Sequence, residues 1–133
     1  LTLRRRMNCH LVPGSNAVLV RLTEQLGEYF AGERTSFAVP IDAPGTAFQE
    51  SVWNELRLIP SGTTISYAAL AAKIGRSKAV RAVARANGDN RLAILIPCHR
   101  VVGSDGKLTG YAGGLWRKQR LLDLESVRPV RGE

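Results

Sequence analysis

The stretch SYAALAAKIGRSKAVRAVARAN, residues 66–87, contains two short amphipathic segments separated by a glycine. Ser66 can cap a first helix, and Gly75 ends it. The buried side of this first helix is predicted to consist of Tyr67, Leu70 and Ile74. Ser77 can cap a second helix over residues 78–87. Two helices joined by a short turn that contains glycine are typical of a helix-turn-helix, so the pattern predicts that motif.

The second helix of this motif carries much of the chain's excess positive charge. The chain has 133 residues and a net charge of +8, with 19 Lys and Arg against 11 Asp and Glu. Residues 73–91 hold six of the basic residues and one acid. The basic side chains of the helix share the side opposite its apolar residues: Lys78, Arg81 and Arg85. A solvated surface face is the plain alternative, but the coincidence of motif and charge favours DNA as the partner.

The contacts expected from this basic face are with the DNA backbone. Ala82 and Ala86 are small enough to let the helix approach a phosphodiester strand closely. The basic side offers no Asn or Gln to pair with adenine. Binding through phosphates and DNA shape, with weak sequence preference, therefore fits better than reading of the major groove.

The chain before the motif predicts two more helices. Apolar residues recur at helical spacing over residues 16–31, and residues 37–41 form a short extended connector in which Pro40 forbids a central strand. Thr46 and Gln49 have the spacing of a capping box at the start of the next helix. The apolar stripe of that helix is predicted to be Phe48, Val52, Leu56 and Ile59.

The chain after the motif predicts one strand and one helix. Residues 92–96 are a continuous apolar run of strand length, which predicts a strand buried on both faces, and Pro97 ends it. A glycine-rich loop then leads to a last helix over residues 115–125. The elements together predict an α+β, mainly helical fold, with a winged-helix-like helix-turn-helix domain and one short buried strand.

Cys98 follows the predicted strand and precedes His99 and Arg100. A free cysteine at a strand end is most simply a small hydrophobic residue. Positive neighbours or an imidazole base, however, favour the thiolate, which is the nucleophilic form. Successive side chains of a strand point to opposite faces, so a turn or a bridging water would have to connect His99 with Cys98. A structural and a reactive Cys98 are both open interpretations.

Glu125 falls on the apolar side of the last helix, where a carboxylate is unexpected. A surface ion pair with Arg128, three residues further on, is one explanation. The other is that Glu125 orients His99 and completes a Cys/His/Glu relay.

Cysteine content and hydropathy exclude several classes of protein. The two cysteines, Cys9 and Cys98, cannot form a disulfide framework, which favours a reducing compartment. A zinc site that adds His10 and His99 to them would lack CxxC spacing, and adjacent residues rarely bind one ion, so no metal is predicted. No apolar run is long enough to span a bilayer, and no apolar stretch of a secretory signal follows the basic start. A cytoplasmic protein of bacterial type, with no membrane partner, is expected.

Residues 94–102, ILIPCHRVV, resemble the active-site signature of the O6-alkylguanine-DNA alkyltransferases, also called methylated-DNA–protein-cysteine methyltransferases. Further stretches stand in the family's order and spacing: GTAFQ at 45–49, VW at 52–53, SY at 66–67, KAVRAV at 78–83, Asn90, and GYAGGL at 110–115. The resemblance covers about residues 17–128, and PCHRV in this setting is a highly specific motif.

The resemblance implies direct reversal of DNA damage without a cofactor. In this family, duplex DNA is bound through its minor groove and the damaged guanine is flipped into a pocket. Its alkyl group then moves irreversibly to a cysteine, so each molecule acts once. O6-alkylguanine is the implied substrate, with O4-alkylthymine as a second one. The implied protein is a monomer that associates with the nucleoid when bound to DNA.

The family's functional residues carry over to matching positions. Cys98 would be the acceptor, His99 the base acting through water, and Glu125 the residue that orients His99. Asn90 would belong to the same hydrogen-bonded hinge, and Tyr67 would donate a proton to the leaving guanine. The implied DNA contacts are Ser66, Lys78, Arg81, Ala82 and Arg85. The implied pocket residues are Tyr67, Val101, Tyr111, Ala112, Gly113 and Gly114.

Arg81 is further implied to fill the space left by the flipped base. The plain alternatives are a solvated Arg81 and a Tyr67 that only packs in the core.

The predicted domain division has three parts. Residues 1–44 are a remnant or divergent N-terminal segment, residues 45–128 are the alkyltransferase DNA-binding and catalytic domain, and residues 129–133 are a tail. The family places a β-rich domain before the catalytic one, and residues 1–44 are too few and too irregular to supply it whole. The competing interpretation is a non-enzymatic helix-turn-helix protein, or the C-terminal part of an adaptive-response transcription regulator.

Overall fold

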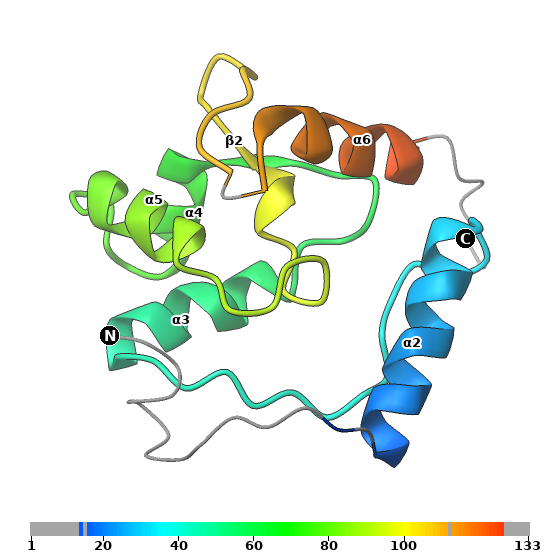
Figure 1. Ribbon diagram of the computed structural model, residues 1–133. Coiled ribbons are helices and arrows are strands. Elements are labelled where there is room, and N and C mark those ends of the chain that lie inside the picture. The colour runs from blue at the N-terminus through cyan, green and yellow to red at the C-terminus, as the bar shows by residue number, and fades with distance from the viewer. Residues whose placement is uncertain (1–13, 15, 112, 127–133) are drawn as a thin grey trace.

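A computed structural model describes residues 14, 16–111 and 113–126 of the chain. Its regular elements, in order, are α2 (Ala17–Phe30), α3 (Ala47–Leu56), β1 (Ile65–Ser66), α4 (Tyr67–Lys73), α5 (Val80–Gly88), the 3₁₀ turn η1 (Cys98–Arg100), β2 (Val101–Val102) and α6 (Leu115–Ser126). Figure 1 shows helices around a very short sheet. In this sheet β1 and β2 run parallel, with Ile65 opposite Val101. The predicted α+β, mainly helical class is confirmed.

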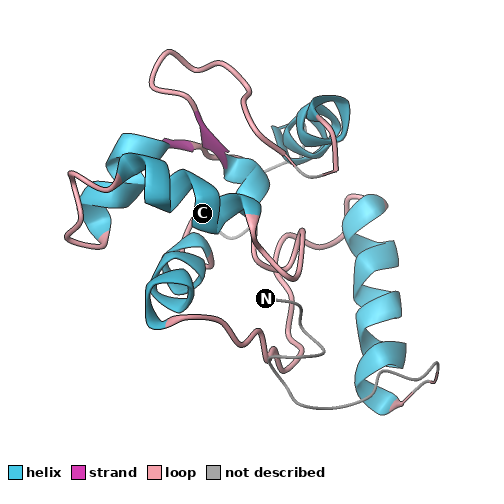
Figure 2. Cartoon of the chain, turned by 60° about the vertical axis from the view of Figure 1, so that its left-hand side comes forward, coloured by secondary structure: helices cyan, strands magenta, loops and turns pink. Residues whose placement is uncertain are grey.

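The hydrophobic core lies where α3, α4 and α5 pack against η1 and β2 (Figure 2). The predicted capping box starts α3, because the Thr46 hydroxyl accepts from the Gln49 amide and the Gln49 side chain accepts from the Thr46 amide. Trp53 of α3 is buried, and its indole Nε1 donates to the Ala86 carbonyl of α5 at 2.8 Å. A buried tryptophan with its N–H satisfied contributes a large apolar area and fixes how α3 crosses α5.

The helix-turn-helix is formed by α4 and α5. Ser66 caps α4 as predicted, since its hydroxyl accepts from the Ala69 amide at 3.0 Å. Gly75 has a φ of +72°, a conformation that favours glycine and that ends α4. The predicted cap at Ser77 is wrong: Ala79 occupies the N-cap position without a side-chain hydrogen bond, and α5 begins at Val80. The segment before it forms a turn closed by Ala79 N–H donating to the Arg76 carbonyl.

The strand predicted over residues 92–96 is also wrong. This segment is a series of turns whose amides bond within it, with Ile96 N–H donating to the Leu92 carbonyl at 2.9 Å. Asn90 holds both ends, because its side chain accepts from Leu92 N–H and donates to the Ile96 carbonyl. Ile94 has a φ of +75°, which is unusual for a β-branched residue and incompatible with a strand. Apolar character alone could not separate a strand from a compact loop.

Helix α2 stands beside the rest of the structure (Figure 1). The predicted helix over residues 16–31 is confirmed within one residue at each end, and Asn16 caps it. The helix buries Gln25 and Tyr29, whereas its first turns expose Val18, Leu19 and Val20. The last helix, predicted over residues 115–125, is confirmed as α6. No helix among the described residues is long and apolar enough to cross a membrane.

Candidate active site

Cys98 begins η1, directly after Pro97, and its side chain is almost fully buried. It is a free cysteine. Its backbone is held on both sides, since its amide donates to the Ile96 carbonyl and its carbonyl accepts from Asn87 Nδ2 of α5 at 3.3 Å. The 3₁₀ turn takes Cys98 and His99 out of the alternating geometry of a strand. A turn or a bridging water was needed to connect His99 with Cys98, and the structure contains such a turn.

A small cavity of about 90 Å³ contains the Cys98 side chain. Asn87, Asn90, Ala93 and Tyr111 contribute to its wall, with Gly88, Gly110 and Gly113. A larger cavity of about 610 Å³ opens beside it along α4 and α5, and includes Tyr67 and Arg81. The two cavities share Gly88, Gly110 and Tyr111. The thiol thus lies in a recess that borders the hollow beside the helix-turn-helix.

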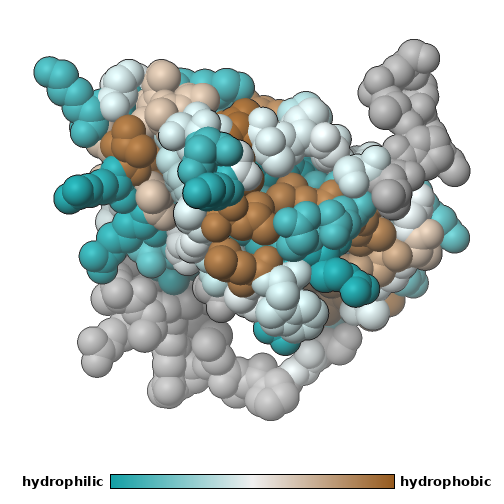
Figure 3. Space-filling view, turned by 90° about the horizontal axis from the view of Figure 1, so that it is seen from above, coloured by the Kyte–Doolittle hydropathy of each residue, from teal (hydrophilic) through white to brown (hydrophobic). Residues whose placement is uncertain are grey.

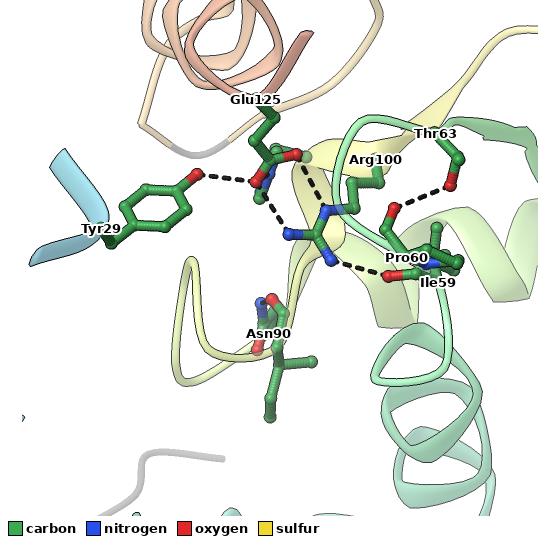
Figure 4. A network of polar contacts seen from close by, with 9 residues as sticks. Tyr29, Ile59, Pro60, Thr63, Asn90, Arg100 and Glu125 are labelled. Atoms are coloured by element: carbon green, nitrogen blue, oxygen red, sulfur yellow. Dashed lines mark hydrogen bonds and ion pairs between the residues drawn. The ribbon is translucent and has the colours of Figure 1, made fainter. Parts of the chain in front are cut away.

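His99 is completely buried and contacts Glu125 of α6, with 2.8 Å between Nε2 and Oε2. The same carboxylate accepts from Arg100 Nε and Nη2 at 2.9 and 2.8 Å, and from the Tyr29 hydroxyl at 2.7 Å. Figure 4 shows Tyr29 and Arg100 converging on Glu125 from two sides. Arg100 Nη1 also donates to the Ile59 carbonyl at 2.6 Å, which ties the cluster to the chain after α3.

These contacts keep Glu125 ionised. Burial by itself would raise the pKa of the Glu125 carboxyl, but hydrogen bonds from His99, Arg100 and Tyr29, and the charge that His99 carries when it is protonated, hold it well below its usual range. The other ring nitrogen of His99, Nδ1, is buried and makes no hydrogen bond within the described residues. A buried polar atom without a partner is costly and marks a place for water or a ligand. The described geometry therefore leaves Nδ1 available for a proton transfer.

The Cys98 thiol is not ionised by its surroundings alone. Burial raises the pKa of the Cys98 thiol, while a hydrogen bond from Asn90 and the charge of Lys118 act to lower it. Lys118 of α6 is itself completely buried, and burial lowers the pKa of its ammonium group. A thiol in this state needs a base at the moment of reaction.

Tyr67 and Lys118 meet at one backbone carbonyl. The Tyr67 hydroxyl and Lys118 Nζ donate to the Thr109 carbonyl at 3.1 and 2.9 Å. The ammonium also lies 5.8 Å from the centre of the Tyr67 ring. These contacts connect α4 and α6 with the loop before α6. They hold the Tyr67 phenol, a hydrogen-bond donor, at the wall of the larger cavity.

The predicted basic face of α5 is exposed. Lys78, Arg81, Ala82 and Arg85 are all solvent-accessible, and Arg85 makes only a loose ion pair of 4.0 Å with Asp89. Ala86 is instead buried in the core, so its predicted approach to a phosphodiester strand is wrong. Arg91 is a structural residue, because it donates to the Pro44 carbonyl and stacks over Trp53.

The remaining predicted pocket residues separate into three groups. Tyr111 and Gly113 line the Cys98 cavity. Val101 is fully buried in the core opposite Ile65, and Gly114 closes the turn that precedes α6. Ala112 lies outside the described residues.

Other predictions also fall on residues that the structure does not describe. These are the Arg128 alternative for Glu125 and the Cys9 and His10 members of the zinc possibility. Among the described residues, no group of three or more His, Cys, Asp and Glu side chains could hold a metal ion.

Residues 47–127 match the family model described as "6-O-methylguanine DNA methyltransferase, DNA binding domain". The chain belongs to the O6-methylguanine DNA methyltransferase family. A methylated-DNA–protein-cysteine methyltransferase of Mycolicibacterium paratuberculosis is 58% identical over 102 residues, which are 77% of this chain and 62% of that protein. The chain therefore spans less than two thirds of the length of this curated relative.

Solved structures of the family agree with the fold. The Mycobacterium tuberculosis O6-methylguanine methyltransferase superimposes with a TM-score of 0.83 at 47% identity, covering 98% of this chain and 77% of that one. A structure of the M. tuberculosis protein in complex with DNA gives a TM-score of 0.84 at 48% identity, covering 95% of this chain and 76% of that one.

Sequence reasoning missed three members of this candidate site. Tyr29 and Lys118 were not predicted to lie at the site, and Asn87 was read only as the end of a helix. Lys118 carried a signal, since it is a lysine on the same side of α6 as Leu121 and Glu125, the positions that the helix buries. For Tyr29, the sequence contains no signal beyond its place on an apolar helix face, because its partner Glu125 is 96 residues away.

Beside the Cys98 cavity lies a wider groove of about 740 Å³ that shares Ala93, Tyr111 and Gly113 with it. Phe30 and Trp116 also line it, and both are more than half exposed. Figure 3, which views the molecule from above Figure 1, shows hydrophobic side chains gathered among hydrophilic ones near the middle of the visible face. Apolar surface thus reaches the solvent next to the candidate site.

Proposed function

We propose that this chain repairs DNA by transferring the alkyl group of O6-alkylguanine to Cys98, irreversibly and once per molecule. The observation that carries the proposal is that a buried thiol is followed in the chain by the buried His99, which Glu125 holds at Nε2 and which has no partner at Nδ1 among the described residues. The family membership and the named activity of the relatives support the same reaction.

In the proposed reaction the Cys98 sulfur attacks the alkyl carbon. One S–C bond forms as the bond from that carbon to guanine O6 breaks. His99 takes the thiol proton at Nδ1, through a water molecule, and Glu125 stabilises the imidazolium that results. The products are a thioether and an unmodified guanine, and no step regenerates the thiol. Asn90 assists by donating to the sulfur while its contacts to Leu92 and Ile96 keep the loop in place.

Tyr67 is proposed to protonate the departing guanine, because neutral guanine is a better leaving group than its anion. Its hydroxyl lies at the cavity along α4 and α5, where a flipped base would arrive. Arg81 lines the same cavity and is exposed on α5, so it is suited to occupy the space left in the duplex.

Double-stranded DNA is the proposed partner, bound by Arg81 and Arg85 of α5 and by Lys78 in the turn before it, with Ala82 allowing close approach of the backbone. Ser66 lies nearby, but its hydroxyl is engaged in capping α4, so its proposed DNA contact would come from its backbone. The solved complex of the M. tuberculosis relative with DNA supports this choice of partner.

The direct test is to incubate the folded protein with a duplex containing O6-methylguanine and to locate the adduct by peptide mass spectrometry. We expect a gain of about 14 Da on Cys98, one methyl in place of one hydrogen. The Cys98→Ser variant and a duplex with unmodified guanine should both give no adduct. An unmodified Cys98 in folded protein that binds the duplex would contradict the proposal and favour the non-enzymatic DNA-binding interpretation. A duplex with O4-methylthymine tests the second substrate in the same assay.

A further inference from the structure

We propose that Tyr29 of α2 is a positioning residue for the His99–Glu125 pair, so that the alkyl-transfer site extends into the segment before the family's DNA-binding domain. This inference rests on the proposed function. Residues 1–44 are then more than a remnant, because one of their side chains completes the hydrogen bonding of the carboxylate that holds His99.

The geometry around Glu125 supports this role. Oε2 is contacted by three groups: Tyr29 Oη at 2.7 Å, His99 Nε2 at 2.8 Å and Arg100 Nη2 at 2.8 Å. Oε1 accepts from Arg100 Nε at 2.9 Å. A carboxylate has about two lone-pair sites on each oxygen, so Oε2 with its three contacts is fully engaged, whereas Oε1 has one. Tyr29 and His99 therefore share one oxygen, and the phenol influences how strongly that oxygen holds the imidazole.

Tyr29 is held in place independently of Glu125. Its ring is completely buried and packs against Phe37 with 5.5 Å between ring centres. One turn earlier in α2, Gln25 exchanges hydrogen bonds with the backbone of Ala38, accepting from its amide at 2.9 Å and donating to its carbonyl at 3.5 Å. These contacts anchor α2 to the connector that follows it. The phenol is thus presented to Glu125 by a packed helix.

Removal of the phenol hydroxyl should change the proton affinity of the relay. Without Tyr29, Oε2 has two donors instead of three and attracts the proton of an imidazolium more strongly. In Tyr29→Phe, the His99 imidazole should therefore stay protonated, and unable to act as a base, up to a higher pH. Arg100 of η1 is the other charged group that contacts Glu125, and Lys118 of α6 acts by its charge on the neighbouring Cys98 thiol; Tyr29→Phe leaves both in place.

The experiment compares Tyr29→Phe with the parent chain in a Cys9→Ser background, so that Cys98 is the only thiol. The rates of reaction of Cys98 with O6-methylguanine duplex and with iodoacetamide are measured against pH. We expect the midpoint of the rate profile to move up by about half to one pH unit, with rates about threefold to tenfold lower near neutral pH that converge at high pH. If the parent reacts with iodoacetamide and not with the duplex, the proposed function fails, while the shift with iodoacetamide still decides the role of Tyr29.

Gln25→Leu is the matched control, because it weakens the anchoring of α2 without removing a donor to Glu125. It should lower the urea midpoint and leave the pH midpoint unchanged. An unchanged profile in Tyr29→Phe, or the same shift in Gln25→Leu, would overturn the proposal. Should Tyr29→Phe not fold, proton NMR of the parent still decides: a slowly exchanging Tyr29 hydroxyl proton that is lost in Glu125→Gln supports the contact, and its absence from the parent overturns it.

Discussion

The cluster around Cys98 and the exposed face of α5 use charged residues in opposite ways. In the cluster, Glu125, His99 and Arg100 are buried and joined by hydrogen bonds of 2.8 to 2.9 Å. On α5, the Arg85 side chain is 87% exposed, and its ion pair with Asp89 is 4.0 Å long. Buried charges depend on each other for solvation, whereas exposed charges act almost independently. Substitutions should therefore have large effects in the cluster and graded, salt-dependent effects on α5.

The largest effect is expected for Glu125→Gln. This change leaves the buried guanidinium of Arg100 without its counter-charge and removes the charge of the group that contacts His99. We expect a loss of about 3–5 kcal/mol in the free energy of unfolding, the usual result of breaking a buried ion pair, measured by urea denaturation. Asp123→Asn, on the exposed side of the same helix, is the control and should cost less than about 1 kcal/mol. Equal losses in the two variants would break the contrast between buried and exposed charge.

The pH dependence of stability sharpens the same contrast. The pKa of Glu125 is lower in the folded chain than its ordinary value of 4.5. A carboxyl with a depressed folded pKa stabilises the protein above its unfolded pKa, and that stabilisation is lost as the pH falls toward the folded value. The difference in stability between the parent chain and Glu125→Gln should accordingly shrink below about pH 4.5. Urea denaturation at a series of pH values measures it, and a constant difference would show that the fold does not lower the pKa of Glu125.

A smaller effect is expected for Lys118→Met. Methionine has a similar length, so the core packing is largely kept, but the positive charge that lowers the pKa of the Cys98 thiol is lost. The reaction of Cys98 with iodoacetamide should slow by about tenfold at neutral pH and recover at higher pH. Lys107→Met, on an exposed loop, serves as the control and should leave the rate unchanged. A rate that is insensitive to Lys118 would show that this charge does not reach the thiol.

The smallest effect on stability is expected for Arg81→Ala on α5. The variant should unfold like the parent but bind duplex DNA more weakly, and the slope of log affinity against log salt should fall by about one unit. Arg21→Ala, on the exposed side of α2, should change neither quantity. Fluorescence anisotropy over a range of salt concentrations measures the slope. An identical slope in Arg81→Ala and the parent would remove Arg81 from the DNA contact.

Local patterns could be predicted from the sequence, whereas most contacts between segments that are distant in the chain could not be predicted. The capping box of Thr46 and the cap by Ser66 involve residues three positions apart, so their sequences contain both partners. The cap predicted at Ser77 failed because Arg76 and Ala79 close a turn that delays the helix start. The strand predicted over residues 92–96 was wrong because the Asn90 side chain and the positive φ of Ile94 shape this segment into a loop. The apolar composition of the segment does not reveal either feature.

The candidate site shows the same limit. The link between His99 and Glu125 was foreseen from a carboxylate on an apolar helix side and from the family resemblance. The contact of Tyr29 with Glu125 depends on where α2 packs, and no spacing along the chain encodes that.

We propose that Cys98 accepts one alkyl group from DNA and that no step regenerates its thiol. The most direct measurement is a titration of the folded protein with increasing O6-methylguanine duplex, read by intact and peptide mass spectrometry. We predict that methylation rises with the duplex added, stops at one methyl group per chain and is confined to Cys98. Repaired guanine in excess of the protein, or a methyl group on any other residue, would contradict the claim.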